Sequence, residues 1–319
     1  MTSQLINESL LSFIHEQTGR EAVYEQEPIP LLGGIDATTY KFKLRGMEPM
    51  VLRLLGSDRS AEEVKRLQIH SQALIHSNIK AAKVYWVGED KSVLGGVFAI
   101  MKFFPDPLLA EQPDDIQLKT LGKSHAQMHN ISTPKIINSL KDQGLNEKDF
   151  MTSLFIPTIL DSAQIDHPWL SNILNWLQNN LPIASTHASI NHGDYHPRNI
   201  MYASGHITGI IDWNFSIGDP AFDVGHTITL IMDIIPNISN DYSLEIASKN
   251  NEQYRDAYQS IRSIDDRAVT ACRAFQCTGF LLRCLSGKKD IITSSPAMLK
   301  SLKTTIENIT KLEIALPNS

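Results

Sequence analysis

The sequence predicts an α+β fold in which a small, sheet-rich N-terminal lobe is followed by a larger, mainly helical C-terminal lobe. Short apolar or alternating runs bounded by turn residues dominate the first third of the 319 residues. Longer segments with helical spacing of apolar side chains follow them. Pro105 and Pro107 interrupt the pattern between the two regions. We therefore expect two lobes, residues 1–104 and 105–319.

The N-terminal lobe is expected to contain two helices and four strands. The first residues form an amphipathic pattern that buries Leu5, Leu10, Phe13 and Ile14 on one helical face. Strands are expected at residues 38–44, 49–56, 83–88 and 96–104. Residues 60–75 have helical spacing and begin with a capping-box pattern, in which a serine is followed by a glutamate three positions later.

The C-terminal lobe reads as helices around one irregular segment. Residues 114–131 predict a helix with Ile116, Leu121 and Met128 in the core, and residues 167–181 predict another. From about Pro220 the chain is mostly helical. The stretch INHGDYHPRNIM, residues 190–201, contains glycine and proline, so it is neither a regular helix nor a regular strand. Two short apolar runs after it, joined by ASGH, predict a β-hairpin.

Composition excludes several classes of protein. The hydrophobic fraction of 42% suffices for a core, and the formal net charge of -6 argues against a general nucleic-acid-binding surface. The apolar stretch at residues 224–235 is too short and too polar to span a bilayer. Three cysteines in one apolar stretch indicate packing residues in a reducing compartment. We expect a soluble, cytoplasmic protein without nucleic-acid or membrane partners.

Three residues around the irregular segment indicate phosphoryl-transfer chemistry. The predicted hairpin would bring Asn199 and Asp212 to the same end, so that an amide oxygen and a carboxylate converge. Both are hard oxygen ligands of the kind that Mg²⁺ prefers. Asp194 stands apart as a carboxylate that can orient or deprotonate an attacking hydroxyl. Phosphoryl transfer needs little beyond positioning, cations on the phosphates and an oriented nucleophile.

Other interpretations of the histidine-rich segments remain open. The stretch from residue 190 to 201 could be a polar turn, or His187, His192 and His196 could bind zinc. His125 and His129 lie four residues apart on one predicted helix and could face a metal. The sequence HAQMH lacks the glutamate that a metalloprotease requires, which favours a pair that packs or forms local hydrogen bonds.

The segments HGDYHPRN and IIDWNFSIGDPAFDVGH resemble the catalytic loop and the metal-binding segment of the aminoglycoside phosphotransferase family. That family shares the bilobal protein-kinase-like fold with choline kinases and other small-molecule kinases. The resemblance implies that Asp194 is the catalytic aspartate and that Asn199 and Asp212 bind magnesium. It further implies structural support from three residues, which hold the loop and cap the next helix: His192, Asp219 and Asp223.

The N-terminal lobe is similar to the nucleotide-binding lobe of the same family. The Gly33–Gly34 turn resembles the loop that covers the phosphates, where glycine lets backbone N–H groups approach an anion. Arg53 occupies the position of the strand cation that contacts phosphates, with Glu63 as its carboxylate partner and Glu62 as a second candidate. Backbone groups near Met101 and Phe103 would contact adenine.

The resemblance implies transfer of a phosphate from ATP (or GTP), with Mg²⁺, to a hydroxyl of a small molecule such as an antibiotic, choline, an amino acid or a sugar. Only six residues separate Asp212 from Asp219, which leaves no room for the long activation loop of a protein kinase. We expect a monomer or a homodimer. A catalytically weak kinase-like module that binds a ligand or partner is the alternative, because Arg198 stands where the family commonly has glycine.

Overall fold

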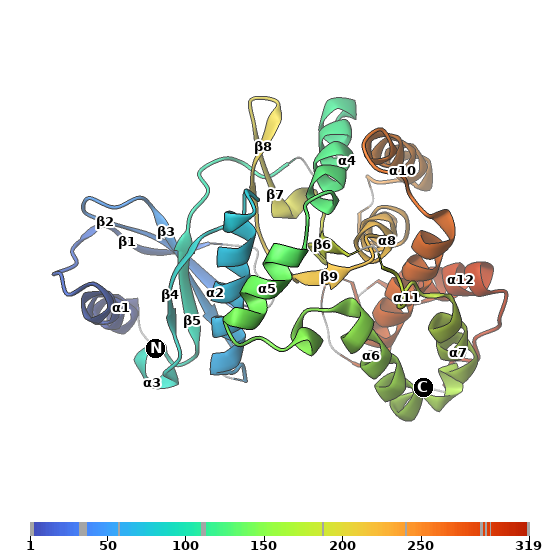
Figure 1. Ribbon diagram of the computed structural model, residues 1–319, viewed down its shortest axis with the longest axis horizontal. Helices are drawn as coiled ribbons and strands as arrows, with labels where there is room; N and C mark the ends of the chain where they lie inside the picture. The colour runs from blue at the N-terminus through green and yellow to red at the C-terminus, as the bar shows by residue number, and fades with distance from the viewer. Residues whose placement is uncertain are drawn as a thin grey trace. The chain divides into compact units, whose positions relative to one another are not determined.

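The computed structural model describes residues 3–31, 37–56, 58–109, 113–186, 188–239, 241–287, 290, 292–293 and 295–317. The chain divides into two compact units. The first comprises Met1–Asp106 together with two short later segments, Asn138–Leu145 and Thr208–Ile211. The second comprises the remainder. The elements of both units are labelled in Figure 1.

The first unit contains a five-stranded antiparallel sheet with the strand order β1-β2-β3-β5-β4. Its strands are β1 (Tyr24–Leu31), β2 (Ala37–Leu44), β3 (Met50–Leu55), β4 (Val84–Gly88) and β5 (Phe98–Lys102). The sequence predicts the last four and misses β1. Strand β1 reads YEQEPIPL, and prolines and glutamates are unfavourable in a central strand. It lies at the edge of the sheet, the position where a strand tolerates proline.

Helices α1 (Ser3–Thr18) and α2 (Ala61–His76) lie on opposite sides of this sheet (Figure 1), and the short α3 spans Lys91–Leu94. Leu10 and Ile14 of α1 pack with Leu52 and Phe98 in one buried cluster. The apolar positions expected in the first helix are therefore confirmed for Leu10, Phe13 and Ile14. The predicted capping box at the start of α2 is also present.

Most helices belong to the second unit, as the sequence predicts. They are α4 (Asp115–His129), α6 (Thr152–Asp166), α7 (Ser171–Asn180), α8 (Ala221–Thr229), α9 (Ile235–Ile238), α10 (Leu244–Gln259), α11 (Asp266–Leu285) and α12 (Pro296–Thr310); α5 (Pro134–Asp142) begins in this unit. A π-helical turn, Leu230–Ile234, joins α8 to α9. Helix α8 packs closely on α11. The two helices are so close at Gly225 that a Cβ added there would lie 2.7 Å from the Cβ of Cys272.

Two expectations for these helices need correction. Ile116 was expected in the core, but it is 67% exposed, whereas Leu118, Leu121 and Met128 of α4 are buried. Helix α4 packs mainly against α10, and Ile116 in its first turn stays exposed. The helix expected from residue 167 begins instead as the 3₁₀ turn Pro168–Leu170, and α7 follows it.

The strands that precede and follow the irregular segment in the sequence form two small sheets. Strand β6 (Ser189–Asn191) pairs with β9 (Ser216–Gly218) in antiparallel register. Strands β7 (Ile200–Ala203) and β8 (His206–Ile210) pair with each other, which confirms the predicted hairpin. Its connection is two residues, Ser204 and Gly205, with φ of 51° and 83°. Two positive φ values match the type I′ turn that suits strand twist in short hairpins.

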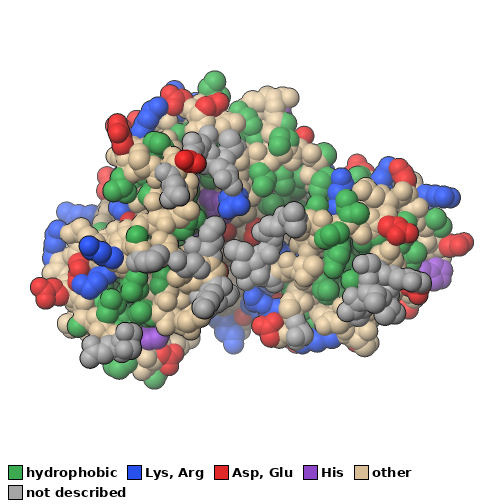
Figure 2. Space-filling view, turned by 180° about the vertical axis from the view of Figure 1, so that it is seen from behind, with side chains coloured by type: hydrophobic (Ala, Val, Ile, Leu, Met, Phe, Trp, Pro, Cys, Tyr) green, Lys and Arg blue, Asp and Glu red, His purple; other side chains and the backbone are tan. Residues whose placement is uncertain are grey.

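On the face drawn in Figure 2, acidic and basic side chains of the described residues are interspersed with apolar and polar ones. Within the part of the chain that the structure describes, every helix is too short or too polar to cross a membrane.

Candidate active site

The segment from His192 to Asn199 follows β6 and precedes the β7–β8 hairpin. Gly193 has φ of 79°, and a Cβ added there would lie 2.6 Å from the carbonyl oxygen of Asn214. The Asn214 N–H in turn donates to the carbonyl oxygen of His192 at 2.9 Å. The turn therefore needs glycine both for its left-handed conformation and for this close backbone approach.

Asp223, in the first turn of α8, holds the backbone of this loop. Its Oδ2 accepts the His192 N–H at 2.6 Å, and its Oδ1 accepts the Gly193 N–H at 2.8 Å. Asp223 is 1% exposed, so both bonds are shielded from water, where charge-assisted hydrogen bonds are strong. The loop conformation is thus tied directly to helix α8.

His125 and His129 of α4 meet the same carboxylate from its other side. Their Nε2 atoms lie 2.9 and 3.3 Å from Oδ2 of Asp223, and their Nδ1 atoms lie 2.7 Å from the hydroxyls of Tyr254 and Tyr258. Each ring nitrogen has a hydrogen-bond partner, which agrees with the local hydrogen-bonding interpretation of the pair. The ligating atoms of His125, His129 and Asp223 also lie close enough together for a metal ion.

Burial and these contacts shift the pKa values of Asp223 and His129. Burial alone would raise the pKa of the Asp223 carboxyl, but the charges and hydrogen bonds of the two histidines hold it well below its usual range. Burial and the neighbouring His125 lower the pKa of His129 to about 4. Asp223 is therefore an anion and His129 a neutral imidazole at neutral pH.

Asp194 projects its carboxylate from the anchored loop and remains 28% exposed. Oδ2 accepts a hydrogen bond from Nδ2 of Asn199 at 3.0 Å and lies 3.4 Å from Nε2 of His196. Oδ1 lies 3.1 Å from Nε2 of His226. Burial alone would raise the pKa of this carboxyl, but hydrogen bonds from His196 and His226 outweigh burial and lower it. Asp194 is consequently an oriented carboxylate in contact with solvent.

Asn199 and Asp212 lie at the same end of the hairpin, just before β7 and just after β8. The Asn199 Nδ2 donates to the carbonyl oxygen and the carboxylate of Asp194, which orients the amide and leaves its oxygen as the group able to bind a cation. Asp212 is exposed and has φ of 59°. An aspartate in the left-handed region carries backbone strain of the kind that clusters at functional sites. The donor set, an amide and a carboxylate oxygen, fits Mg²⁺.

His192 and Asp219 have structural contacts. The Nδ1 of His192 accepts the Asp194 N–H at 3.1 Å, and its buried ring lies 4.5 Å from the ring of Trp213. The Oδ1 of Asp219 accepts the Ala221 N–H at the start of α8 at 2.9 Å. The first residue therefore orients the loop and the second one satisfies a helix-terminal donor.

The residues expected to bind the nucleotide belong to the first unit. Arg53 lies on β3 between Thr39 and Ala99 of the neighbouring strands. The carboxylate of Glu63 accepts the Ser60 N–H at 3.1 Å and pairs with Arg59 at 3.0 Å. Its pairing with Arg53 stays a prediction. Gly33 and Gly34 lie outside the described residues.

The segment expected to contact adenine also has its own backbone partners. Met101 lies on β5 opposite Val51 and Val84. The N–H of Phe103 donates to the carbonyl oxygen of Pro49 at 3.2 Å, and the Nζ of Lys41 lies 4.3 Å above the Phe103 ring.

Sequence reasoning missed His226. This residue of α8 is 9% exposed and contacts both Asp194 and, through Nδ1 at 3.0 Å, the Oε1 of Gln276 on α11. The available signal was its spacing, since His226 follows Asp223 by three residues on a predicted helix and so shares its face.

The alternative zinc interpretation involves His187, His192 and His196. Of these, His187 lies outside the described residues.

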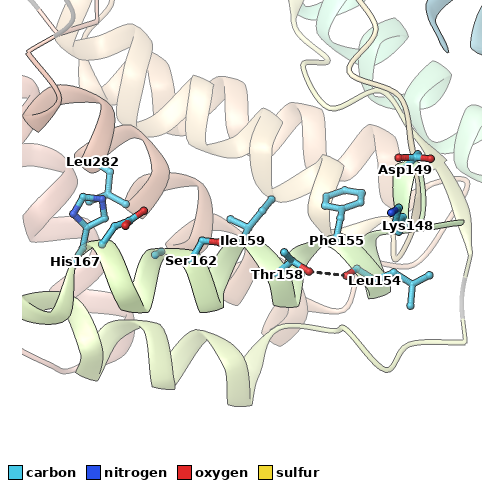
Figure 3. Close-up of a pocket in the computed structure, with 11 residues that line it drawn as sticks. Lys148, Asp149, Leu154, Phe155, Thr158, Ile159, Ser162, His167 and Leu282 are labelled. Carbon is cyan, nitrogen blue, oxygen red and sulfur yellow. Dashed lines mark hydrogen bonds between the residues drawn. The ribbon is translucent and has the colours of Figure 1, made fainter. Parts of the chain in front are cut away.

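A groove of about 510 Å³ runs along α6 in the same unit. Figure 3 shows Phe155, Thr158, Ile159 and Ser162 on successive turns of α6, with Leu282 of α11. Just before α6, the carbonyl oxygen of Phe150 accepts the Ile217 N–H of β9 at 2.7 Å. The groove thus combines apolar and polar side chains from α6 and α11.

Solved structures of similar fold cover nearly the whole chain. A candidate aminoglycoside phosphotransferase of Ralstonia eutropha is 21% identical, with a TM-score of 0.66 and coverage of 95% of each chain. An amicoumacin kinase, solved with AMP-PNP, Ca²⁺ and amicoumacin, is 13% identical, with a TM-score of 0.60 and coverage of 97% of this chain and 96% of its own. These similarities confirm the protein-kinase-like α+β fold.

A curated relative is a probable acyl-CoA dehydrogenase of Arabidopsis thaliana, 24% identical over 186 residues. The matched part is 52% of this chain, and the chain spans about a fifth (22%) of the length of that protein. The profile of the family described as Phosphotransferase enzyme family matches residues 27–263, which include the loop from His192 to Asn199, the hairpin and α8. The chain therefore belongs to this phosphotransferase enzyme family.

Proposed function

We propose that the protein is a small-molecule kinase that transfers the γ-phosphate of ATP to an alcohol. The observation that carries this proposal is the Asp194–Asn199 pair, in which one side chain orients the other on a loop anchored by Asp223. The kinase solved with AMP-PNP and amicoumacin has a similar fold, and this similarity supports the proposal that the protein binds a nucleotide and a small acceptor.

Asp194 would receive the acceptor hydroxyl. Its carboxylate is ionised at neutral pH and partly exposed, so it can accept the hydroxyl hydrogen bond and align the oxygen for attack. The acceptor oxygen forms a bond to the γ-phosphorus as the bond from that phosphorus to the bridging oxygen breaks. The proton of the hydroxyl passes to Asp194, and ADP leaves with the bridging oxygen.

Asn199 and Asp212 would hold Mg²⁺ through the amide oxygen and the carboxylate. The bound cation supplies neutralising charge at the phosphates. The hydrogen bonds from Nδ2 of Asn199 to Asp194 keep its amide oxygen turned away from the carboxylate. In the first unit, Arg53 would contact the phosphates and the backbone around Met101 and Phe103 the adenine.

The test is Mg²⁺-dependent ADP formation across a panel of hydroxylated antibiotics, amino alcohols, amino acids and sugars. Asp194→Ala should abolish turnover on the responding acceptor while nucleotide binding, followed by titration calorimetry with Mg-AMP-PNP, stays intact. Asp212→Ala should weaken that binding, and removal of magnesium by EDTA should stop turnover. Turnover that survives Asp194→Ala would overturn this mechanism.

The panel also separates an enzyme from a binding module. Nucleotide or acceptor binding without ADP formation, on every acceptor, would favour a catalytically weak kinase-like module. Arg198→Gly is a useful companion variant, because Arg198 is exposed and lies beside Asn199. If that variant gained turnover, the arginine would be what suppresses activity.

A further inference from the structure

His226 and Gln276 form a chain of side chains that ends on Asp194. The Nε2 of His226 lies 3.1 Å from Oδ1 of Asp194, and its Nδ1 lies 3.0 Å from Oε1 of Gln276. The ring of Phe280 flanks the imidazole, with centroids 6.0 Å apart. The imidazole is therefore held at both nitrogens and packed against an aromatic ring from α11.

The contact places His226 opposite the other partners of the carboxylate. Asn199 and His196 approach Oδ2, whereas His226 approaches Oδ1. A carboxylate oxygen has two acceptor positions, so Oδ1 keeps one for an incoming hydroxyl after it has accepted from His226. With donors on both oxygens, rotation of the carboxylate would break at least one hydrogen bond.

Helix α8 therefore forms hydrogen bonds to the loop at two points. Asp223 holds its backbone at His192 and Gly193, and His226, on the same face of α8, holds the Asp194 side chain. Gly225 allows α8 to approach α11 closely. This approach lets the side chain of Gln276 reach His226.

We propose that His226, oriented by Gln276, is a positioning residue that fixes Oδ1 of Asp194 for the acceptor hydroxyl. The proposal rests on the kinase function proposed above, because it assigns a role within that reaction. It requires Nε2 of His226 to donate to Asp194. Oε1 of Gln276 beside Nδ1 and Oδ1 of Asp194 beside Nε2 are both acceptors, which favours an imidazole with protons on both nitrogens. The contact with Asp194 raises the pKa of His226 against the effect of burial, which favours the same state.

The kinetic test compares four variants on the responding acceptor. His226→Leu removes the donor and should lower kcat by on the order of 10²-fold without changing KM for ATP, since misplacement of a reacting group costs about this much. His226→Gln keeps a donor and should recover part of kcat. Gln276→Met should give an intermediate loss. Thr229→Val is the matched control, because the hydroxyl of buried Thr229 donates to the carbonyl oxygen of Gly225 and also contacts the Cys277 thiol, and neither of these groups touches Asp194. Its kcat should be unchanged.

A spectroscopic test does not depend on turnover. In protein labelled with ¹⁵N-histidine, the imidazole signals lost in His226→Gln identify His226. They should show protons on both nitrogens at pH 6.5, and Asp194→Asn should shift the Nε2 resonance. Unshifted signals in Asp194→Asn, or equal kcat losses in His226→Leu and Thr229→Val, would overturn the positioning role. Failure of the kinase proposal would appear instead as no ADP formation by the wild-type protein, and the NMR result would still decide the contact.

Discussion

The Asp223 carboxylate accepts the N–H of Gly193 at 2.8 Å, so a side chain from helix α8 fixes the turn that directly precedes Asp194. The same carboxylate also meets the His192 N–H and two histidines of α4. One buried anion thus joins the loop from His192 to Asn199 to two helices. The loop has little regular structure of its own, and its shape depends on this anion.

Asp223→Asn should destabilise the protein strongly. An amide offers one oxygen where the carboxylate offers two, and its NH₂ group would face a backbone donor. A buried backbone donor left without its acceptor typically costs about 1–3 kcal/mol. Urea denaturation at pH 7 measures the loss. Asp219→Asn is the control, because asparagine serves a helix terminus as well as aspartate does, and a change of more than about 1 kcal/mol there would contradict the distinction.

Stability should fall as the pH drops from 6.5 towards 4 because of His129. The unfolded chain protonates this residue near its ordinary pKa of 6.5, whereas the folded protein protonates it only near pH 4. Protons therefore bind the unfolded state preferentially in this window, and the shift is worth about 3 kcal/mol at its lower end. Unfolding free energies at pH 7, 6 and 5 should show a steeper decline for the wild-type protein than for His129→Gln. Parallel profiles would refute this assignment.

Gly193→Ala should impair both stability and turnover. Its φ of 79° is unfavourable for alanine, and the new Cβ would also meet the carbonyl oxygen of Asn214. Gly205→Ala isolates the first effect, since Gly205 has φ of 83° and its Cβ would meet nothing within 4 Å. We expect a loss of about 1 kcal/mol for the control, the cost of one left-handed residue, and a clearly larger loss for Gly193→Ala. Equal melting temperatures would show that the contact with Asn214 is not limiting.

Thiol labelling should distinguish the cysteines. Burial raises the pKa of Cys272 and Cys277 well above the ordinary value, and both are closed to solvent. Cys284 is partly exposed at the end of α11. Iodoacetamide at pH 8 should therefore modify Cys284 in the folded protein and the other two only after unfolding, as peptide mass spectrometry would show. Early modification of Cys272 would contradict the close packing of α8 on α11.

Sequence patterns were most informative where neighbouring residues determine the structure. The hairpin between Asn199 and Asp212 follows from two apolar runs and the short connection ASGH, all within fourteen positions. The capping box of α2 is equally local. Ile116 was placed wrongly because apolar spacing gives a helix its faces, while the partner helix decides which face is buried. The contact of His226 with Asp194 spans 32 residues; local spacing puts His226 on the same helix face as Asp223 but does not identify Asp194 as its partner.

Strand β1 shows a further limit and has a consequence for association. Its two prolines are unfavourable in a strand, so residue propensities do not predict it. Pro28 and Pro30 also lack the N–H that an additional strand would need. Glu25 and Glu27 add charge to the same border. A second copy that approached this border would find an interrupted row of donors and a pair of carboxylates. If the protein dimerises, its subunits should therefore meet through side chains rather than by joining their sheets at β1.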